Sequence, residues 1–387
     1  MVTPGAGSAI RRFAGPEATE LAILCRPEYG SPDPTHQAEA TYRSLAALLD
    51  AEGSSFDDLV GETLYLRDVQ RDLPPILDVR NRVLAALGQG DRAAQPVCIQ
   101  QPPLDQAATL ELAAAAVVPH DRGTWSVRDV SSPGPATARV VRLGDQTSLH
   151  TAQVYGAGAT VFEQASTMFR AGDDLLRQCG MAFRDVVRTW IFLRNIDRDY
   201  GAFNEARRAF YGSRGVERLP ASTGVQGGPP SGEHDCSLHL VAIRSAAGLD
   251  VRPMSTPTLN EAWTYGADFS RGLRVADANA VTLHLSGTAS IDETGRTVHV
   301  GDIAAQVDRM LHNIETLLAR QGATVDDLVS GVTYLKRPAD APLLRAMYHD
   351  RGFDRFPGAL VEAPLCRPEL LCEMEAVAKL PLGRAAG

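Results

Sequence analysis

The stretch QVDRMLHNIETLLARQGATVDDLVSGVTYL, Gln306–Leu335, has two counterparts elsewhere in the same chain. QAEATYRSLAALLDAEGSSFDDLVGETLYL spans Gln37–Leu66, and QASTMFRAGDDLLRQCGMAFRDVVRTWIFL spans Gln164–Leu193. The three segments align without a gap, and their starts are 127 and 142 residues apart. Such offsets have the size of whole domains and exceed any short solenoid period, so we expect three tandem units.

Each copy has the pattern of a helix, a turn and a strand. In the third copy Met310, Ile314 and Leu317 lie at the spacing of an amphipathic helix, and the apolar strand GVTYLK follows a Gly-containing turn. A second helix is expected over Tyr200–Tyr211 of the middle copy, and a strand pair within NAVTLHLSGTASID precedes the first helix of the third. The predicted order is β-β-α-β-α-β-β, an α+β fold with two helices packed on one face of a sheet.

Two stretches rich in Pro, Gly and Ser separate the units, near 119–138 and 246–260. We therefore expect a first unit over residues 1–119, a second over 137–245 and a third over 258–387.

The composition excludes several classes of partner. The net charge is −9 with a pI of about 5.5, and no basic stripe is present, so neither nucleic acid nor a membrane surface is an expected partner. No apolar run has the length of a signal peptide core or a membrane span. The six cysteines include no CxxC pair, which favours a reduced, cytoplasmic chain with free thiols and no zinc site. No nucleotide-binding fingerprint occurs, and we expect neither metal nor organic cofactor.

The pentapeptide LCRPE occurs twice, at Leu24–Glu28 and at Leu365–Glu369. The first copy lies before the first helix of its unit, whereas the second lies in the last strand-loop-strand of the third unit. The two copies therefore occupy different phases of the repeat, and the duplication is coincidental.

The second LCRPE has the more informative context. Arg367 precedes Glu373 by six residues, and Glu373 and Glu375 share one face of the strand CEMEAVAKL while Met374 points to the other. A carboxyl group on an apolar strand is either solvent-facing or placed in a cleft, where desolvation raises its pKa and makes it a proton donor near neutral pH. Arg367 offers a planar fork for a substrate carboxylate. The alternative is a wet sheet edge with an ordinary loop arginine.

The third unit is also the one expected to hold the only active cleft. The corresponding strands TLELAAAAVV and CSLHLVAIR contain no matching Arg-then-Glu pair, and no arginine precedes Glu111. A second cluster, NEAWTYGADFSRGL at 260–273, places Tyr265, Ser270 and Arg271 beside two glycines. Such a loop suits close approach to a ligand, although a surface linker has the same composition.

These motifs resemble the Rid superfamily (YjgF-like proteins). The matching segments are SGTASID (286–292), TVHVGD (297–302), CEMEAVA (372–378) and LPASTGVQG (219–227). The resemblance covers nearly the whole chain in three copies, the first of them degenerate. It implies an intramolecular pseudo-trimer with clefts between units, either monomeric or in a higher homo-oligomer. It also implies that Glu373, the first glutamate of its strand, is a functional position.

Within that superfamily the motif order resembles the chorismatases, which remove the enolpyruvyl group of chorismate as pyruvate. The shared order is YG…FSR, SGTASI, H-x-GD and C-R-x-x-LL-x-E. The resemblance implies a general acid at Glu373, carboxylate binding by Arg367, Arg271 and Tyr265, and a cysteine, Cys366, of the 3-hydroxybenzoate-forming type. Further expected substrate contacts are Ser270, Gly287, Thr288, Ala289 and Glu375.

Three functions stay open at this point. The first is a chorismatase-like lyase or hydrolase acting on a small carboxylated enol ether. The second is Rid-type hydrolysis of an imine or enamine to a ketone and ammonia, which SGTASIDETG favours. The absence of an arginine in GALVEAPL, after Phe356-Pro357, argues against it. The third is a catalytically silent binding protein built from degenerate copies.

Overall fold

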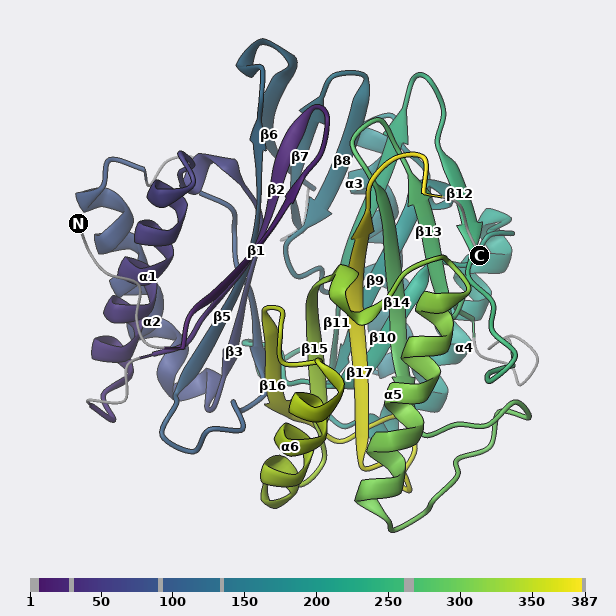
Figure 1. Cartoon of the computed structure of the whole chain (residues 1–387). Coiled ribbons are helices and arrows are strands. Elements are labelled where there is room, and N and C mark those ends of the chain that lie inside the picture. Colours follow the sequence, from purple (N-terminus) through teal and green to yellow (C-terminus); the bar gives the residue numbers. More distant parts are fainter. Residues whose placement is uncertain (1–6, 28–30, 90–92, 133–135, 261–267, 385–387) are drawn as a thin grey trace.

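The computed structural model describes residues 7–27, 31–89, 93–132, 136–260 and 268–384, which form three sheets, each with its own helix pair (Figure 1). The first sheet has the strand order β1-β2-β5-β3-β4. Its elements are β1 (Ala9–Ala14), β2 (Ala18–Cys25), α1 (Pro34–Ala51), β3 (Leu59–Leu66), α2 (Val69–Ala86), β4 (Val97–Gln100) and β5 (Leu110–Pro119).

The second and third sheets have the orders β10-β9-β11-β8-β7-β6 and β12-β13-β14-β17-β15-β16. The second unit contains β6 (Trp125–Ser131), β7 (Thr137–Leu143), β8 (Gln146–Thr151), α3 (Val161–Gln178), β9 (Val186–Leu193), α4 (Ile196–Arg214), β10 (Ala221–Gln226) and β11 (Cys236–Ser245). The third contains β12 (Asp250–Pro253), β13 (Gly272–Ala276), β14 (Val281–Ala289), α5 (Ile303–Ala319), β15 (Leu328–Leu335), α6 (Ala341–Arg351), β16 (Gly358–Glu362) and β17 (Cys372–Leu380).

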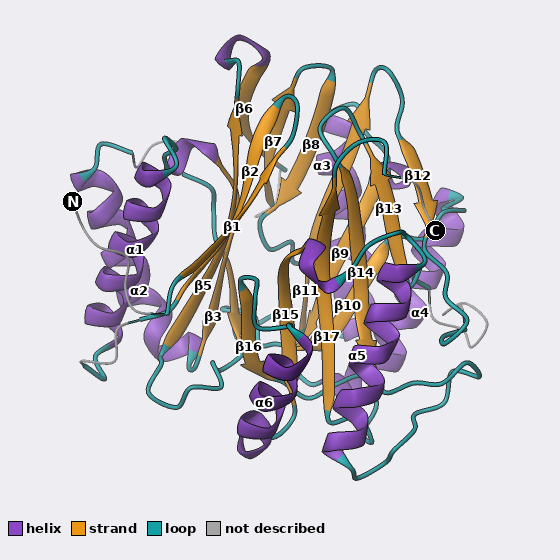
Figure 2. Ribbon diagram, in the orientation of Figure 1, coloured by secondary structure: helices purple, strands orange, loops and turns teal. Residues whose placement is uncertain are grey.

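The predicted order β-β-α-β-α-β-β is confirmed in all three units, and each sheet is antiparallel except at one edge. There the strand after the second helix pairs in parallel, as β4 does with β3, β10 with β9 and β16 with β15. Figure 2 shows each helix pair lying beside the sheet of its own unit. The repeat thus predicted the α+β class and the element order correctly.

Two local expectations were wrong. The stretches near 119–138 and 246–260, expected to be linkers, contain the edge strands β6 and β12, which extend the second and third sheets. The segment NAVTLHLSGTASID forms the single strand β14, and its antiparallel partner is β13. Apolar alternation marked the long central strand, but it did not separate a hairpin from one continuous strand.

The glutamine that begins each repeat fastens its helix to the last strand of the same unit. The amide of Gln306 donates to the carbonyl of Glu369, and its oxygen accepts from Leu371 N–H, just before β17. Gln37 and Gln164 make the corresponding contacts to Thr109 N–H and Asp235 N–H. Because each glutamine satisfies backbone groups at a buried strand start, its recurrence reflects folding rather than chemistry.

The three units close into a ring through equivalent backbone hydrogen bonds. Gln100 N–H donates to Gly228 O at 2.9 Å, Gln226 N–H to Pro364 O at 3.1 Å, and Glu362 N–H to Pro102 O at 2.8 Å. Each donor is the last residue of a parallel edge strand. Each acceptor lies two residues after the last residue of the equivalent strand in the next unit. The chain is therefore an intramolecular pseudo-trimer.

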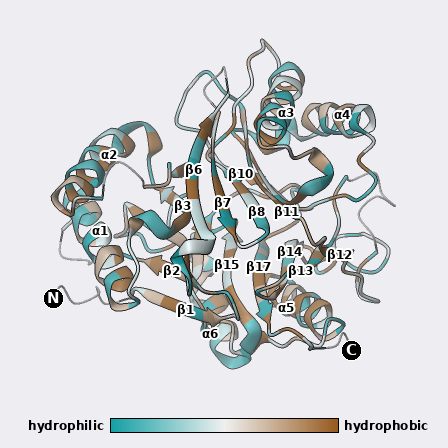
Figure 3. Ribbon diagram, turned by 90° about the horizontal axis from the view of Figure 1, so that it is seen from above, coloured by the Kyte–Doolittle hydropathy of each residue, from teal (hydrophilic) through white to brown (hydrophobic). Residues whose placement is uncertain are grey.

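Seen from above, the three helix pairs lie at the periphery with the strands between them (Figure 3). The largest buried apolar cluster contains residues of all three units, among them Tyr65, Phe192 and Tyr334. No helix among the described residues has the length and apolar character needed to cross a membrane.

The second unit has an aromatic core that makes its packing testable. Phe169 of α3 is fully buried and contacts the rings of Phe183, Phe203 and Phe210. Phe169→Ala should lower the free energy of unfolding by about 3–5 kcal/mol, because it removes buried apolar surface and leaves a cavity. Urea denaturation measures this. Phe162→Ala, on the same helix but 41% exposed, should change it by less than about 0.5 kcal/mol. Equal losses in the two variants would contradict the assigned core.

Candidate active site

A cavity of about 200 Å³ lies between the second and third units. The second unit contributes one face of α4 and part of β10, and the third contributes the start of β17, the end of β14 and the loops beside them. The lining residues are Tyr200, Asn204, Arg207, Ser222, Gly224, Phe269, Arg271, Gly287, Ala289, Ile291, Cys366, Arg367, Leu370 and Glu373.

Glu373 is positioned by the centre of the third sheet. Its strand β17 lies between β14 and β15, with Glu373 opposite Ala289 on one side and Tyr334 on the other. Met374 points to the helix-covered face, where its sulfur accepts from the Tyr348 hydroxyl at 3.4 Å. The alternation of the strand therefore directs Glu373 away from the helices and toward the second unit.

The SGTAS motif supplies a bend opposite Glu373. The pairing of β14 with β17 shifts register between Leu285 and Thr288, as at a β-bulge. A side chain at Gly287 would overlap the Glu373 carboxyl group, so only glycine leaves room for it. The Gly287 N–H donates to Thr223 Oγ1 of the second unit at 3.0 Å, which holds the bend against β10.

The environment of Glu373 favours its protonated form. The side chain is 5% exposed, and burial followed by the charge of Glu375 raises its pKa to about 8. Arg271, Arg188 and Arg367 oppose that rise without cancelling it. A carboxyl group in this state donates a proton near neutral pH.

Three arginines line the same cavity. The Arg271 guanidinium is anchored to Asn260 O at 2.8 Å, and Arg367 to Gly295 O at 2.7 Å. Arg207 of α4 is 2% exposed, and its Nε and Nη2 have no hydrogen-bond partner among the described residues. Buried guanidinium groups without partners are costly, so Arg207 is suited to an anion brought by a ligand.

Cys366 borders the cavity next to Glu373. Burial raises the pKa of its thiol to about 12, so the thiol is protonated at neutral pH. A buried neutral thiol is a poor nucleophile, and its contribution to the cavity is shape and polarity.

The structure brings together six of the residues singled out in the sequence: Glu373, Cys366, Arg367, Arg271, Gly287 and Ala289. Ser270, Thr288 and Glu375 do not line this cavity. Ser270 O accepts from Ser286 Oγ, Thr288 Oγ1 donates to Ser286 O, and Glu375 faces the space between the three sheets. Tyr265 lies outside the described residues.

Sequence reasoning missed the half of the cavity that the second unit provides. Tyr200, Asn204 and Arg207 occur at helical spacing on one face of α4. Three polar residues on the inward face of a helix are unusual, and this pattern could have indicated the second wall of the cavity from the sequence. The sequence did not show which unit that face would meet.

Comparison with known proteins indicates the family of the chain. The family described as endoribonuclease L-PSP matches residues 266–380. The 3-aminoacrylate deaminase RutC of Acinetobacter baylyi is 31% identical over 97 residues, which are 25% of this chain and 77% of the deaminase. The chain belongs to the Rid superfamily.

Two further matches extend beyond a single Rid unit. A crystal structure of a chorismatase aligns with 92% of this chain and 98% of its own at a TM-score of 0.63 and 17% identity, which shows the shared fold. A 3-hydroxybenzoate synthase of Streptomyces hygroscopicus is 27% identical over 237 residues. That alignment covers 54% of this chain and 66% of the synthase, so the chain spans just under two thirds of that relative.

The Rid unit at the N-terminal end has a filled counterpart of the cavity. Glu111 is opposite Tyr65 as Glu373 is opposite Tyr334, and Arg26 pairs with it at 3.2 Å. Arg26 also donates to Gly358 O of the third unit at 2.9 Å. The expectation that no arginine accompanies Glu111 was wrong, because the arginine comes from the end of β2 and not from the approach to β5. The first LCRPE, although out of phase with the second, thus places Arg26 inside a cleft.

The cleft between the sheet of the second unit and the first unit contains no acid at this position. Ser237 is opposite Phe192, in the place of Glu373, and Gln153 Nε2 donates to its hydroxyl at 3.3 Å. Gln153 Oε1 in turn accepts from Cys98 N–H of the first unit. Of the three equivalent clefts, the one with Glu373 combines an acid of raised pKa with three arginines around a cavity of about 200 Å³.

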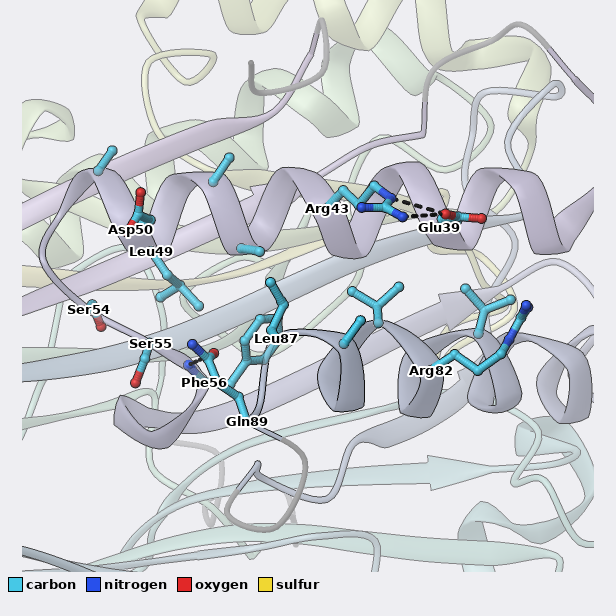
Figure 4. A pocket seen from close by; sticks show the side chains of 16 residues that line it. Glu39, Arg43, Leu49, Asp50, Ser54, Ser55, Phe56, Arg82, Leu87 and Gln89 are labelled. Atoms are coloured by element: carbon cyan, nitrogen blue, oxygen red, sulfur yellow. Dashed lines mark hydrogen bonds and ion pairs between the residues drawn. The ribbon is translucent and has the colours of Figure 1, made fainter. Parts of the chain in front are cut away.

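A larger groove of about 890 Å³ lies elsewhere, between α1 and α2 of the first unit (Figure 4). Its walls are mainly apolar, and Arg43 and Glu39 form an ion pair at its edge. It contains none of the residues predicted for the site.

The raised pKa of Glu373 should make stability depend on pH. Between the usual glutamate pKa of about 4.3 and a folded pKa of about 8, the folded chain holds a proton that the unfolded chain has lost. Stability therefore falls as pH rises through this window, by up to about 1.4 kcal/mol per pH unit. Glu373→Gln removes this loss, so its stability relative to the parent chain should rise by a few kcal/mol between about pH 5 and about pH 9.

Urea denaturation across this pH range measures the difference. Glu369→Gln, on the exposed loop before β17, is the matched control and should show no such trend. A constant difference between Glu373→Gln and the parent chain would contradict a protonated Glu373.

Proposed function

We propose that this chain is a chorismatase-like enzyme that protonates the enolpyruvyl group of chorismate, or of a closely related enol ether carboxylate, and releases pyruvate. The observation that carries the proposal is a buried carboxyl group with a pKa of about 8, in a cavity bordered by three arginines. Similarity to a 3-hydroxybenzoate synthase and the fold of a chorismatase support it.

The proposed step begins with transfer of the Glu373 proton to the terminal methylene carbon of the enol ether. This forms a methyl group and an oxocarbenium ion whose charge the resulting Glu373 carboxylate stabilises. In the hydrolytic route one water adds to the oxocarbenium carbon and its released proton returns to Glu373. The bond between that carbon and the ring oxygen then breaks, which gives pyruvate and a dihydroxycyclohexadiene carboxylate. In the aromatising route the bond between the ring and that oxygen breaks and pyruvate leaves. The ring then loses one proton, which returns to Glu373, and a hydroxybenzoate is formed without net consumption of water.

The arginines suit a substrate with two carboxylates. Arg207 offers unpartnered guanidinium nitrogens from the second unit, while Arg271 and Arg367 approach from the third. Guanidinium forks bind carboxylates in two-point contacts, and two such contacts would fix the enol ether beside Glu373. This chemistry requires no metal or organic cofactor.

Among the two products we propose the hydroxybenzoate. Cys366 borders the cavity with Glu373, and its neutral thiol is a poorer hydrogen-bond partner for an attacking water than a hydroxyl group would be. A relative that is 27% identical over 237 residues is itself named a 3-hydroxybenzoate synthase. Incubation with chorismate, followed by a pyruvate assay and chromatography of the aromatic products, tests both statements. Absence of pyruvate above the uncatalysed rate rejects the function.

A second candidate is hydrolysis of an imine or enamine to a ketone and ammonia. The 31% identity with the 3-aminoacrylate deaminase RutC favours it, and Glu373 would then activate water. The strand β16 after Phe356-Pro357 contains no arginine, which counts against it. Ammonia release from enzymatically generated imino acids distinguishes the two reactions. A binding protein without activity is the conclusion if neither pyruvate nor ammonia is formed.

Replacement of the proposed acid should affect turnover far more than the fold. Glu373→Gln keeps the side-chain volume but cannot donate a proton as an acid, so kcat should fall by about 10²–10⁴-fold. Pyruvate release at saturating chorismate measures this. Glu111→Gln is the matched control in the first unit, where Arg26 already occupies the cleft, and it should leave kcat nearly unchanged. Equal losses in both variants would show that the chemistry is not confined to the cleft of Glu373.

Arg207 should contribute mainly to substrate binding. Arg207→Met keeps the apolar part of the side chain but removes the guanidinium, and KM should rise by about 10–100-fold, the usual effect of losing a charged hydrogen bond. Arg214→Met on the same helix removes an arginine that pairs with Asp173 outside the cavity, and KM should not change. An unchanged KM in Arg207→Met would exclude this residue from the binding site.

A further inference from the structure

Glu375 is the second acid on the same face of β17, and it lies outside the candidate active site. The side chain is 5% exposed and borders a second cavity, of about 330 Å³, enclosed by strands of all three units. Residues two apart on a strand project to the same side roughly 6–7 Å from each other. Two carboxyl groups in one sheet interior therefore influence each other strongly.

Two side chains of the second unit hold Glu375 in place. Arg188 Nη2 donates to Glu375 Oε2 at 2.7 Å, and Trp190 Nε1 donates to Glu375 Oε1 at 2.5 Å. Both donors lie on β9, and the Arg188 guanidinium stacks over the Trp190 ring at 4.5 Å. Arg188 is 1% exposed, so the pair is shielded from water and its geometry is fixed.

The same arginine reaches the bend beside Glu373. Arg188 Nη2 also donates to Thr223 Oγ1 at 2.6 Å, and this oxygen accepts the Gly287 N–H. Gly287 in turn lies against the Glu373 carboxyl group. A continuous path of contacts thus joins Glu375, Arg188, Thr223 and Gly287 to Glu373.

The charged groups around Glu373 come from every element packed against it. Glu375 lies on its own strand, Arg188 on β9, Arg271 before β13 and Arg367 in the loop before β17. Arg207 lines the cavity from α4. The nearby titratable groups without charge at neutral pH are Tyr334 of β15, Tyr200 of α4 and Cys366, whose pKa values burial raises. Glu375 is thus the one acid among several cations in the described surroundings of Glu373.

The other units lack this second acid. Ala113 occupies the place of Glu375 in the first unit, opposite Thr63, and His239 occupies it in the second, opposite Trp190. Glu111, without a neighbouring acid, pairs with Arg26 as an ion pair. Glu373, with Glu375 beside it, forms no ion pair within 4.0 Å among the contacts of the described residues, although Arg271 and Arg367 border the same cavity. Burial raises the pKa of both glutamates; Glu375 raises that of Glu373 further, whereas Arg26 opposes the rise at Glu111.

We propose that Glu375, fixed by Arg188 and Trp190 of the second unit, is a positioning residue that keeps Glu373 protonated near neutral pH. This deepens the proposed function, because it rests on Glu373 as the acid. The charge of Glu375 acts through space on Glu373, and Arg188 neutralises that charge enough for it to stay buried while its hydrogen bond to Thr223 keeps the bend in place.

Direct titration of Glu373 tests this without any substrate. Infrared spectroscopy follows the carboxylic C=O band of the folded protein against pH, and the band that disappears in Glu373→Gln belongs to Glu373. Its midpoint in the parent chain should lie at about pH 8. In Glu375→Gln the midpoint should fall by about one pH unit or more, because a like charge is removed and Arg188 is left without its anion.

Glu62→Gln is the matched control. Glu62 belongs to an equally buried ion pair with Arg80 at 2.8 Å in the first unit, far from Glu373 in the chain and on a different sheet. It should lose stability without moving the midpoint. If Glu375→Gln does not fold, the double variant Arg188→Gln/Glu375→Gln replaces it, because removing both partners leaves no lone buried charge. The titration midpoint of Glu373 in this double variant should still lie below that of the parent chain, since the charge of Glu375 acts on Glu373 more strongly than that of Arg188 does. An unchanged midpoint in the folded variant, or an equal shift in Glu62→Gln, overturns the proposal.

The pH dependence of activity gives the second readout. For an enzyme that needs protonated Glu373, kcat/KM falls as pH rises through the pKa of this residue, and Glu375→Gln should move that fall to lower pH. A purely structural role would lower kcat/KM by the same factor at every pH. If the protein releases pyruvate from chorismate but the midpoint does not move in Glu375→Gln, only the proposed role of Glu375 is rejected. If the midpoint moves but no pyruvate is released, only the proposed function is rejected.

Discussion

Three backbone hydrogen bonds between successive units impose the geometry on which everything else depends. Each of the edge strands β4, β10 and β16 ends by donating an N–H to the chain segment that follows the equivalent strand of the next unit. An unpaired sheet edge and a bare apolar sheet face would both be unfavourable in water. The ring satisfies the edges and turns the helix-free faces toward one another. It therefore also decides which helix meets which strand at every cleft.

The same ring produces three clefts with the same backbone and different contents. Arg26 fills the cleft beside the sheet of the first unit through its ion pair with Glu111, and Gln153 contacts Ser237 in the cleft beside the sheet of the second unit. The third cleft keeps a cavity because Gly287 and Ala289 leave space opposite Glu373. This cleft differs from its two counterparts because small residues lie beside the acid and arginines line the cavity.

How far the sequence could predict this depends on whether the information was local. The recurring glutamines and apolar spacings repeat within each unit, so the element order followed from them, whereas the pseudo-trimer was implied by the resemblance to the Rid superfamily. Strand alternation likewise put Glu373 and Glu375 on one face and Met374 on the other, but it left open whether the face of the two acids was buried or exposed to solvent. Arg26 and Glu111 are 85 positions apart, however, and Arg207 lines the cavity of Glu373 from a different unit. No periodic pattern carries such contacts, because they depend on how sheets pack. Edge strands β6 and β12 were missed for a related reason: a strand paired on one side needs little apolar character.

Fusion of the three units into one chain explains why the site can be divided so unevenly. In a trimer of identical chains, an acid pair such as Glu373 and Glu375 would be present in all three sheets, and six carboxyl groups would face one interior. The cost of burying that many like charges would be severe. A fused chain can keep the acids in one unit, place Arg188 and Trp190 in the next, and use Ala113 and His239 at the remaining positions. Each unit is then free to specialise, because the three backbone hydrogen bonds of the ring do not depend on which side chains occupy the clefts.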